Sequence, residues 1–568
     1  MTAREVAPLA FPSDVELLLP GSKSEANRLL VLAALSGRQV RLVGVTPSDD
    51  VRHLIAGLAA LGFCAELDDQ AETAQVGPRR PDPPRSGALY CGNAGTATRF
   101  LVSVAAITPG VWDIHADERM RSRPMRPLAE AWRALGVDVE PTEQGWRVSG
   151  GRPSGGAVAV DGRVSSQFLS SLLLVGAALP RGLEIEVTGP LASRSYAELT
   201  ARAMQTFGVR VELGDLSAKV AHGYGDTPSE VTVGGDWSAM GAWSCINQLT
   251  SSRIQGGNLR RESAQADEAL QAVLDASFGE TDRTIDVAPM PDQFLNLACY
   301  AALRAGTTRL VGAENVRAKE CDRVAVIARE LRRCGADLDV HDDGVTVRGG
   351  AALRGAVIDP EGDHRVAMAL AMLGTVVPGI AVLDAGCVAK SYPSFWDDLD
   401  RVRLSRRPIA LVGMRGAGKS TLGRALADHL AARFVDADEV FEQQHGPIAS
   451  FVDRHSWATF RELELDVLDA SLAAGAVIAT GGGVVETAAA RRLLRARAHV
   501  IYVEAPPSLL VERIAESDRP SLTGRPITDE VEDVLGRRAP YYREIAHRTV
   551  DATLPLDVQI DRAKQQLR

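Results

Sequence analysis

The last third of the chain contains Gly413-Met414-Arg415-Gly416-Ala417-Gly418-Lys419-Ser420, the stretch that decides its fold. It matches the pattern GxxxxGK[ST] at every fixed position, between an expected strand over 409–412 and an expected helix over 421–432. Glycines let backbone N–H groups face phosphate oxygens, and the helix N-terminus adds partial positive charge. An ordinary glycine-rich turn is the alternative, but the flanking strand and helix favour a P-loop nucleotide site on a parallel sheet.

The side chains of this motif suit a nucleotide and its metal ion. Lys419 is expected to reach the β- and γ-phosphate oxygens, and the Ser420 hydroxyl to hold Mg²⁺. The predicted ATP contacts of the loop and the following turn are Gly413, Arg415, Gly416, Ala417, Gly418, Lys419, Ser420 and Thr421.

Five further signals follow the motif in order. Asp436 and Asp438 lie two residues apart at an expected strand end, which would point both carboxylates the same way, although a surface pair is the plainer alternative. Three consecutive glycines after the expected strand 476–479 leave bare backbone where a side chain would block approach. The segment 516–525 is interpreted as a mobile lid or else a solvated loop. The other signals are Phe460-Arg461 with Glu464, Arg519-Pro520, and Arg538 before Ala539-Pro540-Tyr541.

Together, in this order, the signals resemble shikimate kinase over residues 408–568. The resemblance implies that Asp438 orients and deprotonates the shikimate 3-hydroxyl and that Asp436 holds Mg²⁺ through water. It implies that Arg461 and Arg538 bind the shikimate carboxylate, a task that suits the planar guanidinium group. The remaining implied contacts are those of Gly481, Gly482 and Gly483 with the ring and of Arg519 with the transferring phosphate.

A short basic stretch separates this segment from the rest of the chain and ends in Pro408. We therefore predict a first region at 1–404, a linker at 405–408 and a kinase domain at 409–568. In the first region, a helix that ends in an apolar residue plus glycine, followed by an alternating strand, recurs at intervals of 74, 72, 71 and 56 residues. Such spacing suggests a repeated α/β unit, although this succession is common in any α/β protein. The glycines are Gly62, Gly136, Gly208, Gly279 and Gly335.

The first region gathers cations and hydroxyls in short motifs. Several motifs precede apolar helices, and such helix starts are natural anion sites or else merely capped helices. Lys319 and Arg323, four residues apart, are expected on one helix face, where a salt-bridge ladder is the alternative. The motifs are Pro20-Gly21-Ser22-Lys23-Ser24, Asn93-Ala94-Gly95-Thr96-Ala97-Thr98-Arg99, Ser165-Ser166-Gln167-Phe168, Lys319-Glu320-Cys321-Asp322-Arg323, Asp363-His364-Arg365 and Ala389-Lys390-Ser391-Tyr392-Pro393.

In this order the motifs resemble 5-enolpyruvylshikimate-3-phosphate (EPSP) synthase over residues 12–404. The resemblance implies an α/β enolpyruvyl-transferase fold of two subdomains, each with three copies of an α/β unit around a cleft, at 20–235 and at 1–19 plus 236–404. The implied contacts with shikimate 3-phosphate are Lys23, Ser24, Arg28, Ser165, Ser166, Gln167, Ser193, Tyr196, Asp292, Asn315 and Lys319. Those with phosphoenolpyruvate are Lys23, Asn93, Gly95, Thr96, Arg123, Gln167, Arg323, Arg365 and Lys390.

The chemistry of these substrates explains the cations. The two molecules carry two phosphates and two carboxylates, and bringing them into one cleft without cations would meet strong like-charge repulsion. The resemblance implies that Asp292 is the base for the 5-hydroxyl, and that Glu320 and Lys23 move protons at the methylene carbon and the bridging oxygen. No organic cofactor is expected in this region, and Mg²⁺ with ATP is expected in the kinase domain.

The sequence thus predicts a bifunctional enzyme for two consecutive steps of chorismate and aromatic amino acid biosynthesis, in an order along the chain that reverses the reaction order. Phe100 stands where many free-standing synthases have Pro and arom-type multifunctional polypeptides have Phe. The crossover segment Asp236-Trp237-Ser238 lacks a usual second Ser, and Gly362 replaces a usually larger residue. One alternative, a UDP-N-acetylglucosamine enolpyruvyl transferase, typically uses a loop Cys and fits the motifs less well. The other, a nucleotide-sensing or scaffold module, conflicts with the intact set Lys419, Asp438, Arg461 and Arg519.

Composition limits the partners of the chain. Lys plus Arg total 63 against 73 Asp plus Glu, a net charge of -10, so nucleic acid and anionic membranes are not expected partners. The small anionic substrates then need local basic clusters. Seven cysteines without a CxxC pair, and no signal pattern in 1–12, fit a reducing cytoplasm. The longest weakly apolar stretch, 366–389, is broken by Gly and Pro and is not expected to span a membrane. The oligomeric state stays open.

Overall fold

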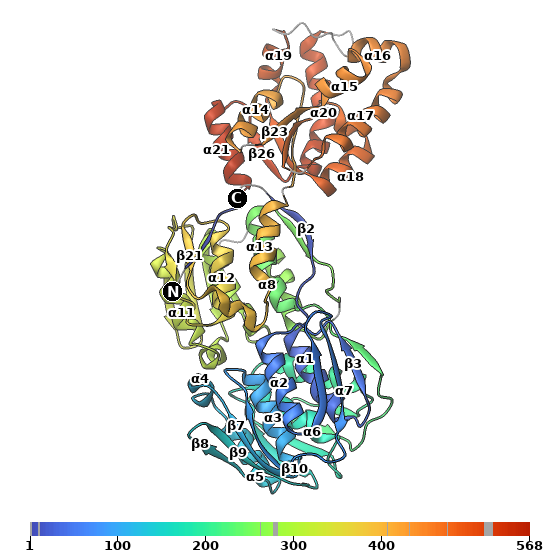
Figure 1. Ribbon diagram of the computed structural model, residues 1–568. Coiled ribbons are helices and arrows are strands. Elements are labelled where there is room, and N and C mark those ends of the chain that lie inside the picture. Colours follow the sequence, from blue (N-terminus) through green and yellow to red (C-terminus); the bar gives the residue numbers. More distant parts are fainter. Residues whose placement is uncertain are drawn as a thin grey trace. The chain divides into compact units, whose positions relative to one another are not determined.

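The computed structural model describes residues 3–9, 12–261, 263–276, 282–405, 407–430, 432–473, 475–515 and 526–567 (Figure 1). Contacts divide the chain into two units. Unit 1 comprises Met1–Pro8, Leu17–Cys245 and Gly256–Asp397; unit 2 comprises Leu9–Glu16, Ile246–Gln255 and Asp398–Arg568. Across the described ranges, no helix combines the length and the apolar character that crossing a bilayer requires.

Four four-stranded sheets of unit 1 share one topology. In each, the first two strands pair parallel, and a β-hairpin adds two antiparallel strands to the second. Three of them belong to the first lobe, which is the predicted subdomain 20–235; the rest of unit 1 is the second lobe. The three sheets are β14 (Glu230–Thr232), β3 (Val40–Val43), β5 (Thr73–Arg79) and β4 (Phe63–Asp68); β6 (Ser86–Tyr90), β7 (Gly110–His115), β9 (Gly145–Gly150) and β8 (Val139–Thr142); β10 (Gly156–Asp161), β11 (Leu183–Thr188), β13 (Ser217–Val220) and β12 (Val211–Leu213). The fourth belongs to the second lobe: β16 (Arg283–Asp286), β17 (Gly306–Val311), β19 (Gly344–Gly349) and β18 (Asp337–His341).

The repeated α/β unit predicted from the glycine spacing is confirmed in these four sheets. In each, a helix connects the second strand to the hairpin and is followed by a predicted glycine with positive φ, the left-handed geometry of a helix C-terminus. The helices are α2 (Asp49–Ala60), α5 (Arg126–Ala134), α7 (Arg194–Thr206) and α11 (Arg323–Arg333), followed by Gly62 (φ +92°), Gly136 (φ +83°), Gly208 (φ +67°) and Gly335 (φ +92°). The fifth glycine, Gly279, lies outside the described residues.

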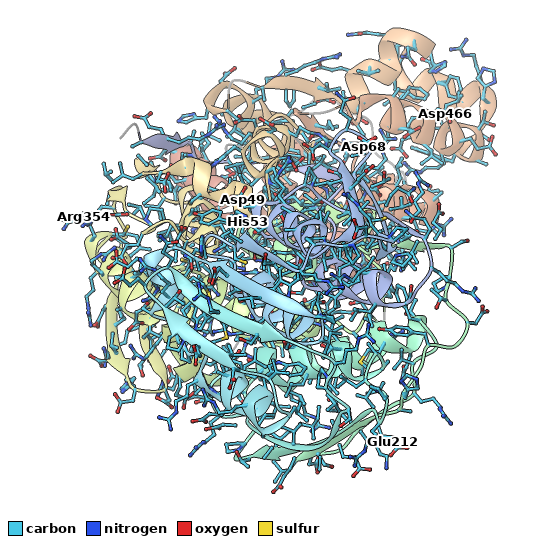
Figure 2. All side chains as sticks on the ribbon, turned by 60° about the horizontal axis from the view of Figure 1, so that its bottom comes forward. Asp49, His53, Asp68, Glu212, Arg354 and Asp466 are labelled. Carbon is cyan, nitrogen blue, oxygen red and sulfur yellow. The ribbon has the colours of Figure 1, made fainter. Side chains whose placement is uncertain are left out.

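The helices of the first lobe pack against one another and form its core (Figure 1). The helix α6 (Ser166–Gly176) is buried on all sides from Phe168 onward, and its leucines are fully buried between neighbouring helices. Glu212, on the edge strand β12, marks the outer rim of one sheet in Figure 2. The helices of this lobe are α1 (Lys23–Leu35), α2, α3 (Gly95–Ala106), α4 (Glu118–Arg121), α5, α6 (Ser166–Gly176) and α7.

Beside its one four-stranded sheet, the second lobe has a smaller sheet of β1 (Arg4–Val6), β21 (Ile380–Val382) and β20 (Val357–Ile358), so the three copies implied by the resemblance are not all four-stranded. The strands β2 (Asp14–Leu17) and β15 (Arg253–Gly256) pair with each other and belong almost entirely to unit 2. The helices of this part of the chain are α8 (Trp237–Thr250), η1 (Ala266–Ala269), α9 (Leu270–Ala276), η2 (Pro291–Gln293), α10 (Phe294–Leu303), η3 (Glu314–Ala318), α11, α12 (His364–Gly374), η4 (Ala385–Lys390) and α13 (Phe395–Leu404).

Two antiparallel stretches of chain join the lobes. Gly21 and Gly235 form a β-bridge, and the flanking Ser22 N–H donates to the Gly234 carbonyl at 2.8 Å. A Cβ on Gly21 would lie 1.8 Å from the Gly44 carbonyl oxygen, so this crossing requires glycine. The loop after it leads directly into α1.

The core of unit 2 is a parallel sheet of five strands in the order β23 (Arg433–Asp436), β24 (Ala476–Ala479), β22 (Ile409–Val412), β25 (His499–Glu504), β26 (Arg548–Asp551). The strands β22 and β24 are buried on both faces, which explains their unbroken apolar sequences. Their carboxyl ends meet at one edge, where α/β proteins place ligands. The helices are α14 (Lys419–His429), α15 (Ala437–His445), α16 (Ile448–His455), α17 (Trp457–Ser471), η5 (Val484–Glu486), α18 (Ala488–Arg497), α19 (Pro507–Ala515), α20 (Ile527–Ile545) and α21 (Leu556–Leu567).

Candidate active sites

The first two turns of α1 place two cations on the cleft of unit 1. Lys23 Nζ lies 3.0 Å from Asp50 Oδ2, and both side chains are nearly inaccessible. Asp50 belongs to the first turn of α2, which also carries Asp49 and His53, both labelled in Figure 2. Arg28 is fully buried one turn after Lys23, and burial lowers its pKa to about 10.

Neighbouring helices hold the Arg28 guanidinium in place. It donates to the Thr200 hydroxyl at 2.7 Å, to the Ser24 carbonyl at 2.6 Å and to the Tyr196 carbonyl at 3.1 Å. A buried guanidinium with this many acceptors has one orientation, so Arg28 forms a fixed wall of the cleft.

The starts of α3 and α6 face each other in the same cleft. Gln167 Nε2 donates to the Thr96 hydroxyl at 3.0 Å, and Arg99 donates to Gln167 Oε1. A Cβ on Gly95 would lie 2.7 Å from Nη2 of Arg123, so the missing side chain makes room for this guanidinium. The glycine therefore lets a cation approach the N-terminus of α3.

The second lobe contributes a network of carboxylates and guanidinium groups. Asp292 lies 2.9 Å from Arg323 and 3.0 Å from Arg365, and it accepts a hydrogen bond from the Tyr196 hydroxyl at 2.7 Å. Arg323 also contacts Glu320 at 3.1 Å and Asp363 at 2.8 Å. Its side chain is only 2% exposed, so every charge it carries is balanced inside the protein.

Burial and charge act in opposite directions on these groups. Burial by itself would raise the pKa of Asp292, but Arg365 and the neighbouring cations hold it well below its usual range. The same balance, with Lys390 as the strongest cation, holds the pKa of Glu320 well below its usual range. Burial lowers the pKa of Lys319, although Asp292 opposes it. The carboxylates are therefore ionised while the cleft contains no competing anion.

Seven cationic side chains and three carboxylates line one cavity between the lobes. Its walls bring together, from both lobes, the predicted residues Lys23, Ser24, Arg28, Gly95, Thr96, Arg123, Ser165, Ser166, Gln167, Ser193, Tyr196, Asp292, Asn315, Lys319, Glu320, Arg323 and Arg365. Two further predicted residues lie just behind the wall, where Lys390 Nζ donates to the Asn93 carbonyl at 2.9 Å and lies 3.2 Å from Glu320. The cavity is thus a local excess of positive charge in an acidic chain.

The structure adds two residues that sequence reasoning missed. Asp50 and Arg99 both line the cavity. Arg99 ends one of the quoted motifs, one turn after Gly95, and this position could have identified it as a site residue. Nothing in the sequence linked Asp50 to Lys23.

One local expectation was wrong. Lys319 and Arg323 do not share a helix face, because η3 ends at Ala318 and α11 begins at Arg323. The Asp322 carboxylate caps α11 by accepting from the Ala325 N–H at 3.0 Å, which fixes the turn between them. The turn directs Lys319 and Arg323 into the same cavity from two different elements.

The P-loop of unit 2 follows β22 and leads into α14, as predicted. Gly416 and Gly418 have φ of +82° and +92°, values that favour glycine. Lys419 Nζ folds back on the loop and donates to the Gly413 and Met414 carbonyls, both at 3.0 Å. Ser420 and Thr421 follow in the first turn of α14, and Arg415 and Ala417 lie in the loop itself.

A serine and an aspartate meet beside this loop. The Ser420 hydroxyl donates to Asp436 Oδ2 at 2.6 Å. The other oxygen of Asp436 caps α15, accepting from the Asp438 N–H at 3.1 Å. Hydroxyl and carboxylate oxygens are the ligands that Mg²⁺ prefers, so the pair fits this metal ion. The expectation that Asp436 and Asp438 share a strand end was wrong, because β23 ends at Asp436 and the cap places Asp438 in the helix.

Each of the three consecutive glycines leaves space that another segment occupies. A Cβ on Gly481 would lie 2.6 Å from Asp438 Oδ1 and 2.7 Å from Glu464 Oε1. A Cβ on Gly483 would lie 2.0 Å from Nη2 of Arg461, and one on Gly482 would lie 3.0 Å from the backbone nitrogen of Arg415. The three glycines thus lie close to the P-loop, Asp438 and Arg461.

Arg461 and Arg538 are joined by a third residue, Glu486. Its carboxylate oxygens lie 2.9 Å from each guanidinium group. Burial opposes ionisation of Glu486, yet the two arginines lower its pKa. Glu464 pairs with Arg461 at 2.7 Å, but its deeper burial raises its pKa. Two guanidinium groups converge here, as a carboxylate site requires.

Glu486 and Arg513 were missed by the sequence analysis. Arg513 donates to the Gly416 and Ala417 carbonyls at 3.4 Å, which puts a cation against the P-loop. Neither residue is part of a motif that would have shown its position. Arg519 and the expected lid at 516–525 lie outside the described residues.

Fold and sites together define the class of the protein: a two-lobed α/β protein with a cationic cleft, joined to a P-loop nucleotide-binding unit. Residues 12–399 match the family model described as EPSP synthase (3-phosphoshikimate 1-carboxyvinyltransferase), and residues 415–567 match the model described as shikimate kinase. The chain belongs to the EPSP synthase family and carries a shikimate kinase segment in tandem. The resemblance predicted from the motifs is confirmed for both segments.

Relatives and solved structures agree with this assignment. The chain is similar to the Pentafunctional AROM polypeptide of Malassezia globosa, at 33% identity over 92% of this chain and 38% of the relative. It is also similar to that of Yarrowia lipolytica, at 31% identity over 95% of this chain and 38% of the relative. The chain therefore spans under two fifths of these relatives' length. An EPSP synthase structure from Acinetobacter baumannii shares the fold of the first region, with a TM-score of 0.58, 22% identity and coverage of 71% of this chain and 98% of that one.

Proposed function

We propose that the chain catalyses two consecutive reactions of the shikimate pathway. Unit 2 phosphorylates the 3-hydroxyl of shikimate with ATP. The cleft of unit 1 then transfers the enolpyruvyl group of phosphoenolpyruvate to the 5-hydroxyl of shikimate 3-phosphate and releases phosphate. The observation that carries this proposal is the convergence of seven cations and three carboxylates on one cavity of a chain with net charge -10.

In the cleft, cations and hydroxyls divide between the two anionic substrates. Ser165, Ser166, Ser193 and Lys319 bind the phosphate of shikimate 3-phosphate, a role supported by their presence in the lining of the same cavity. Lys23, Arg123, Arg323, Arg365 and Lys390 neutralise phosphoenolpyruvate, supported by Asn93, Gly95 and Thr96 at the start of α3. Arg28, Gln167, Tyr196 and Asn315 position the ring.

Proton transfer follows from the ion pairs of Asp292. Its contacts with Arg323 and Arg365 keep the carboxylate ionised and weakly basic. A substrate carboxylate or phosphate that engages these arginines draws them away, so the pKa of Asp292 rises toward that of a useful base. Asp292 then takes the proton of the 5-hydroxyl as the hydroxyl oxygen attacks the enol carbon. Lys23 and Glu320 deliver a proton to the methylene carbon during addition, remove one from the resulting methyl group during elimination, and protonate the bridging oxygen as the C–O bond to phosphate breaks.

In unit 2, Asp438 takes the proton of the 3-hydroxyl, and Arg461 and Arg538 hold the substrate carboxylate. We assign the contacts with the ring to the glycines 481–483, whose backbone without side chains lies beside Asp438, Arg461 and the P-loop. Ser420 and Asp436 would hold Mg²⁺, which neutralises the charge on the β- and γ-phosphates. Lys419 and the loop amides orient the phosphates, and we assign Arg519 to the transferring group. Phosphoryl transfer depends mainly on such positioning.

The location proposed for this enzyme is a reducing, cytoplasmic one. Its support is that all seven cysteines are unpaired and five are buried. The substrates proposed here are small molecules, and neither a nucleic acid nor a membrane is part of the proposal.

The proposal is tested by supplying shikimate, ATP, Mg²⁺ and phosphoenolpyruvate and identifying the products by mass spectrometry. Conversion to EPSP with release of ADP and phosphate is expected. Omission of ATP should stop the sequence at shikimate, and omission of phosphoenolpyruvate should stop it at shikimate 3-phosphate. A chain that leaves supplied shikimate 3-phosphate and phosphoenolpyruvate unchanged would refute the synthase half, and unchanged shikimate with ATP would refute the kinase half.

A further inference from the structure

Arg119 connects the two lobes of unit 1 through backbone carbonyls alone. It belongs to the short helix α4 of the first lobe. Its Nε donates to the Glu320 carbonyl at 2.9 Å and to the Lys319 carbonyl at 3.2 Å. Its Nη2 donates to the Lys319 carbonyl at 2.9 Å and to the Arg317 carbonyl at 3.5 Å. One side chain thus donates hydrogen bonds to three carbonyls some 200 residues away in the sequence.

These carbonyls lie where η3 ends and the turn into α11 begins. The last carbonyls of a helix have no intrahelical N–H partner, and a cation at this end satisfies them and complements the helix dipole. A guanidinium group suits the task because its five donors are fixed in one plane. Arg119 therefore provides hydrogen-bond donors for the backbone carbonyls of Lys319 and Glu320.

The side chains of that same backbone line the cavity. Lys319 and Glu320 both face it, whereas Arg119 is not among its lining residues. Glu320 is held there by Lys390 at 3.2 Å and Arg323 at 3.1 Å. The geometry of all these contacts depends on where the turn after η3 runs.

We propose that Arg119 is a positioning residue for enolpyruvyl transfer, acting through Lys319 and Glu320. It fixes the turn that presents a phosphate-binding ammonium and a proton-transferring carboxylate. The inference rests on the proposed synthase function and adds to it a residue of the opposite lobe that touches no substrate. Correct placement of the second-lobe residues then requires a cation of the first lobe.

The chain offers a matched control on the same helix. Arg121 lies two residues further along α4 and also donates to a backbone carbonyl, that of Glu143. Glu143 lies between β8 and β9 of the first lobe, far from η3 in the chain. Arg121→Ala removes the same charge and the same type of bond without touching the turn at Lys319.

The experiment compares Arg119→Ala, Arg119→Lys and Arg121→Ala in the full chain. Supplied shikimate 3-phosphate and phosphoenolpyruvate give the synthase rate, and shikimate with ATP gives the kinase rate of the same sample. Loss of several charge-assisted hydrogen bonds should lower kcat/KM of the synthase by roughly 10- to 100-fold in Arg119→Ala. The Lys variant, which keeps the charge and some donors, should recover part of the loss. Arg121→Ala and all kinase rates should stay within about twofold of the parent chain.

The pH profile separates positioning from a merely structural role. Release of the turn frees Glu320 from its cations, so the acid limb of the synthase kcat profile should move to higher pH in Arg119→Ala, with an unchanged unfolding temperature. Equal effects of Arg119→Ala and Arg121→Ala, or a rate loss without a moved profile, would overturn the inference while the parent chain still formed EPSP. A parent chain without synthase activity would overturn the proposed function as well.

Discussion

At the scale of single residues, both sites depend on glycines whose missing side chains are replaced by atoms from elsewhere in the chain. Gly95 admits the Arg123 guanidinium, and Gly481 and Gly483 admit a carboxylate pair and the Arg461 guanidinium. These positions have no positive φ in the structure, so steric space rather than backbone conformation selects glycine. Adding a single methyl group therefore tests the geometry of each site directly.

Gly95→Ala should weaken phosphoenolpyruvate binding. The new Cβ would lie 2.7 Å from Nη2 of Arg123, and this flexible guanidinium can retreat without unfolding the helix. We expect the KM for phosphoenolpyruvate to rise roughly tenfold, with little change in unfolding temperature. Steady-state kinetics and a thermal melt measure both. Gly87→Ala is the control, because its Cβ would meet only Trp112 at 3.6 Å, and an equal effect of both substitutions would contradict the argument.

Gly483→Ala should affect only the kinase. Its Cβ would lie 2.0 Å from Nη2 and 2.6 Å from Cζ of Arg461, so the guanidinium must leave its pairing with Glu486. The KM for shikimate should rise by roughly 10- to 100-fold, and the synthase rate should not change.

The matched control for this change is Gly536→Ala in α20, where a Cβ would meet nothing within 4 Å. Alanine in a helix interior stabilises by about 0.5–1 kcal/mol relative to glycine, so this variant should keep its kinetics and melt slightly later. A normal shikimate KM in Gly483→Ala would show that Arg461 does not hold the substrate.

At the scale of elements, the sheet of unit 2 contains a pair of histidines that must be neutral. His499 begins β25 and stacks on His547, which precedes β26, at 5.2 Å between ring centroids. Burial, with a smaller contribution from Arg407, lowers the pKa of His499 well below its usual range and that of His547 to about 4. His547 Nδ1 accepts from the Val500 N–H at 3.0 Å, which also requires an unprotonated nitrogen.

Stability of unit 2 should therefore fall on acidification below pH 6.5. An unfolded histidine binds a proton near pH 6.5, but the folded rings do not until about pH 4 for His547, so the unfolded state binds more protons in this window. Each ring then contributes a slope of at most about 1.4 kcal/mol per pH unit, which destabilises as pH falls. Above pH 6.5 the rings are neutral in both states and the slope vanishes.

Urea unfolding at pH 7 and at pH 5, monitored by the loss of shikimate phosphorylation, measures this slope. His499→Phe keeps a ring of similar size and removes one proton-binding group, so its midpoint should depend less on pH than that of the parent chain. His429→Gln changes an exposed histidine and should leave the dependence as it was. A parent midpoint that did not move between these pH values would contradict the role of the pair.

Elements with strong local signals could be predicted from the sequence, and their junctions could not. The strands at 409–412 and 476–479 lie where expected because unbroken apolar runs define them locally, and the helix after the P-loop, expected over 421–432, spans Lys419–His429. The strand order of the sheets depends on contacts between distant segments and left no local pattern. Asp438 and Lys319 were assigned to the wrong element because one capping side chain decides where each helix starts, Asp436 for α15 and Asp322 for α11.

The residues of the candidate sites also divide into those with a local sequence signal and those that only the tertiary fold brings to the site. Residues such as Lys23, Asp292 and Arg323 could be assigned because the resemblance supplied their roles, and the structure gathers them around one cavity. Asp50 and Arg119 contact the site only through the tertiary fold, from segments whose local sequence is unremarkable. Pairings across lobes are a property of packing, so one sequence without its structure does not reveal them.

At the scale of the whole molecule, the charge of the cleft lining is opposite in sign to the net charge of the chain. The chain carries -10 overall, yet the cleft lining of unit 1 has four more cations than carboxylates. A negative surface around a positive cavity keeps the protein from binding polyanions nonspecifically while small anions are concentrated at the site. The P-loop and the arginine pair of unit 2 form a separate set of cationic groups, so under the proposed function each reaction uses its own residues.

Two substitutions in the full chain test this separation. Lys419→Met removes the cation of the P-loop, so ATP-dependent phosphorylation of shikimate should fall by about 100-fold or more, while EPSP formation from supplied shikimate 3-phosphate continues. Lys23→Ala should do the opposite, because the cleft loses an ammonium group beside Asp50 and the P-loop is untouched. Lys219→Met, which removes an exposed lysine paired with Glu184, should change neither rate. Each variant is assayed for both products in one sample by mass spectrometry. If either active-site substitution lowered both rates, the two sites would be coupled, and the assignment of one reaction to each unit would be wrong.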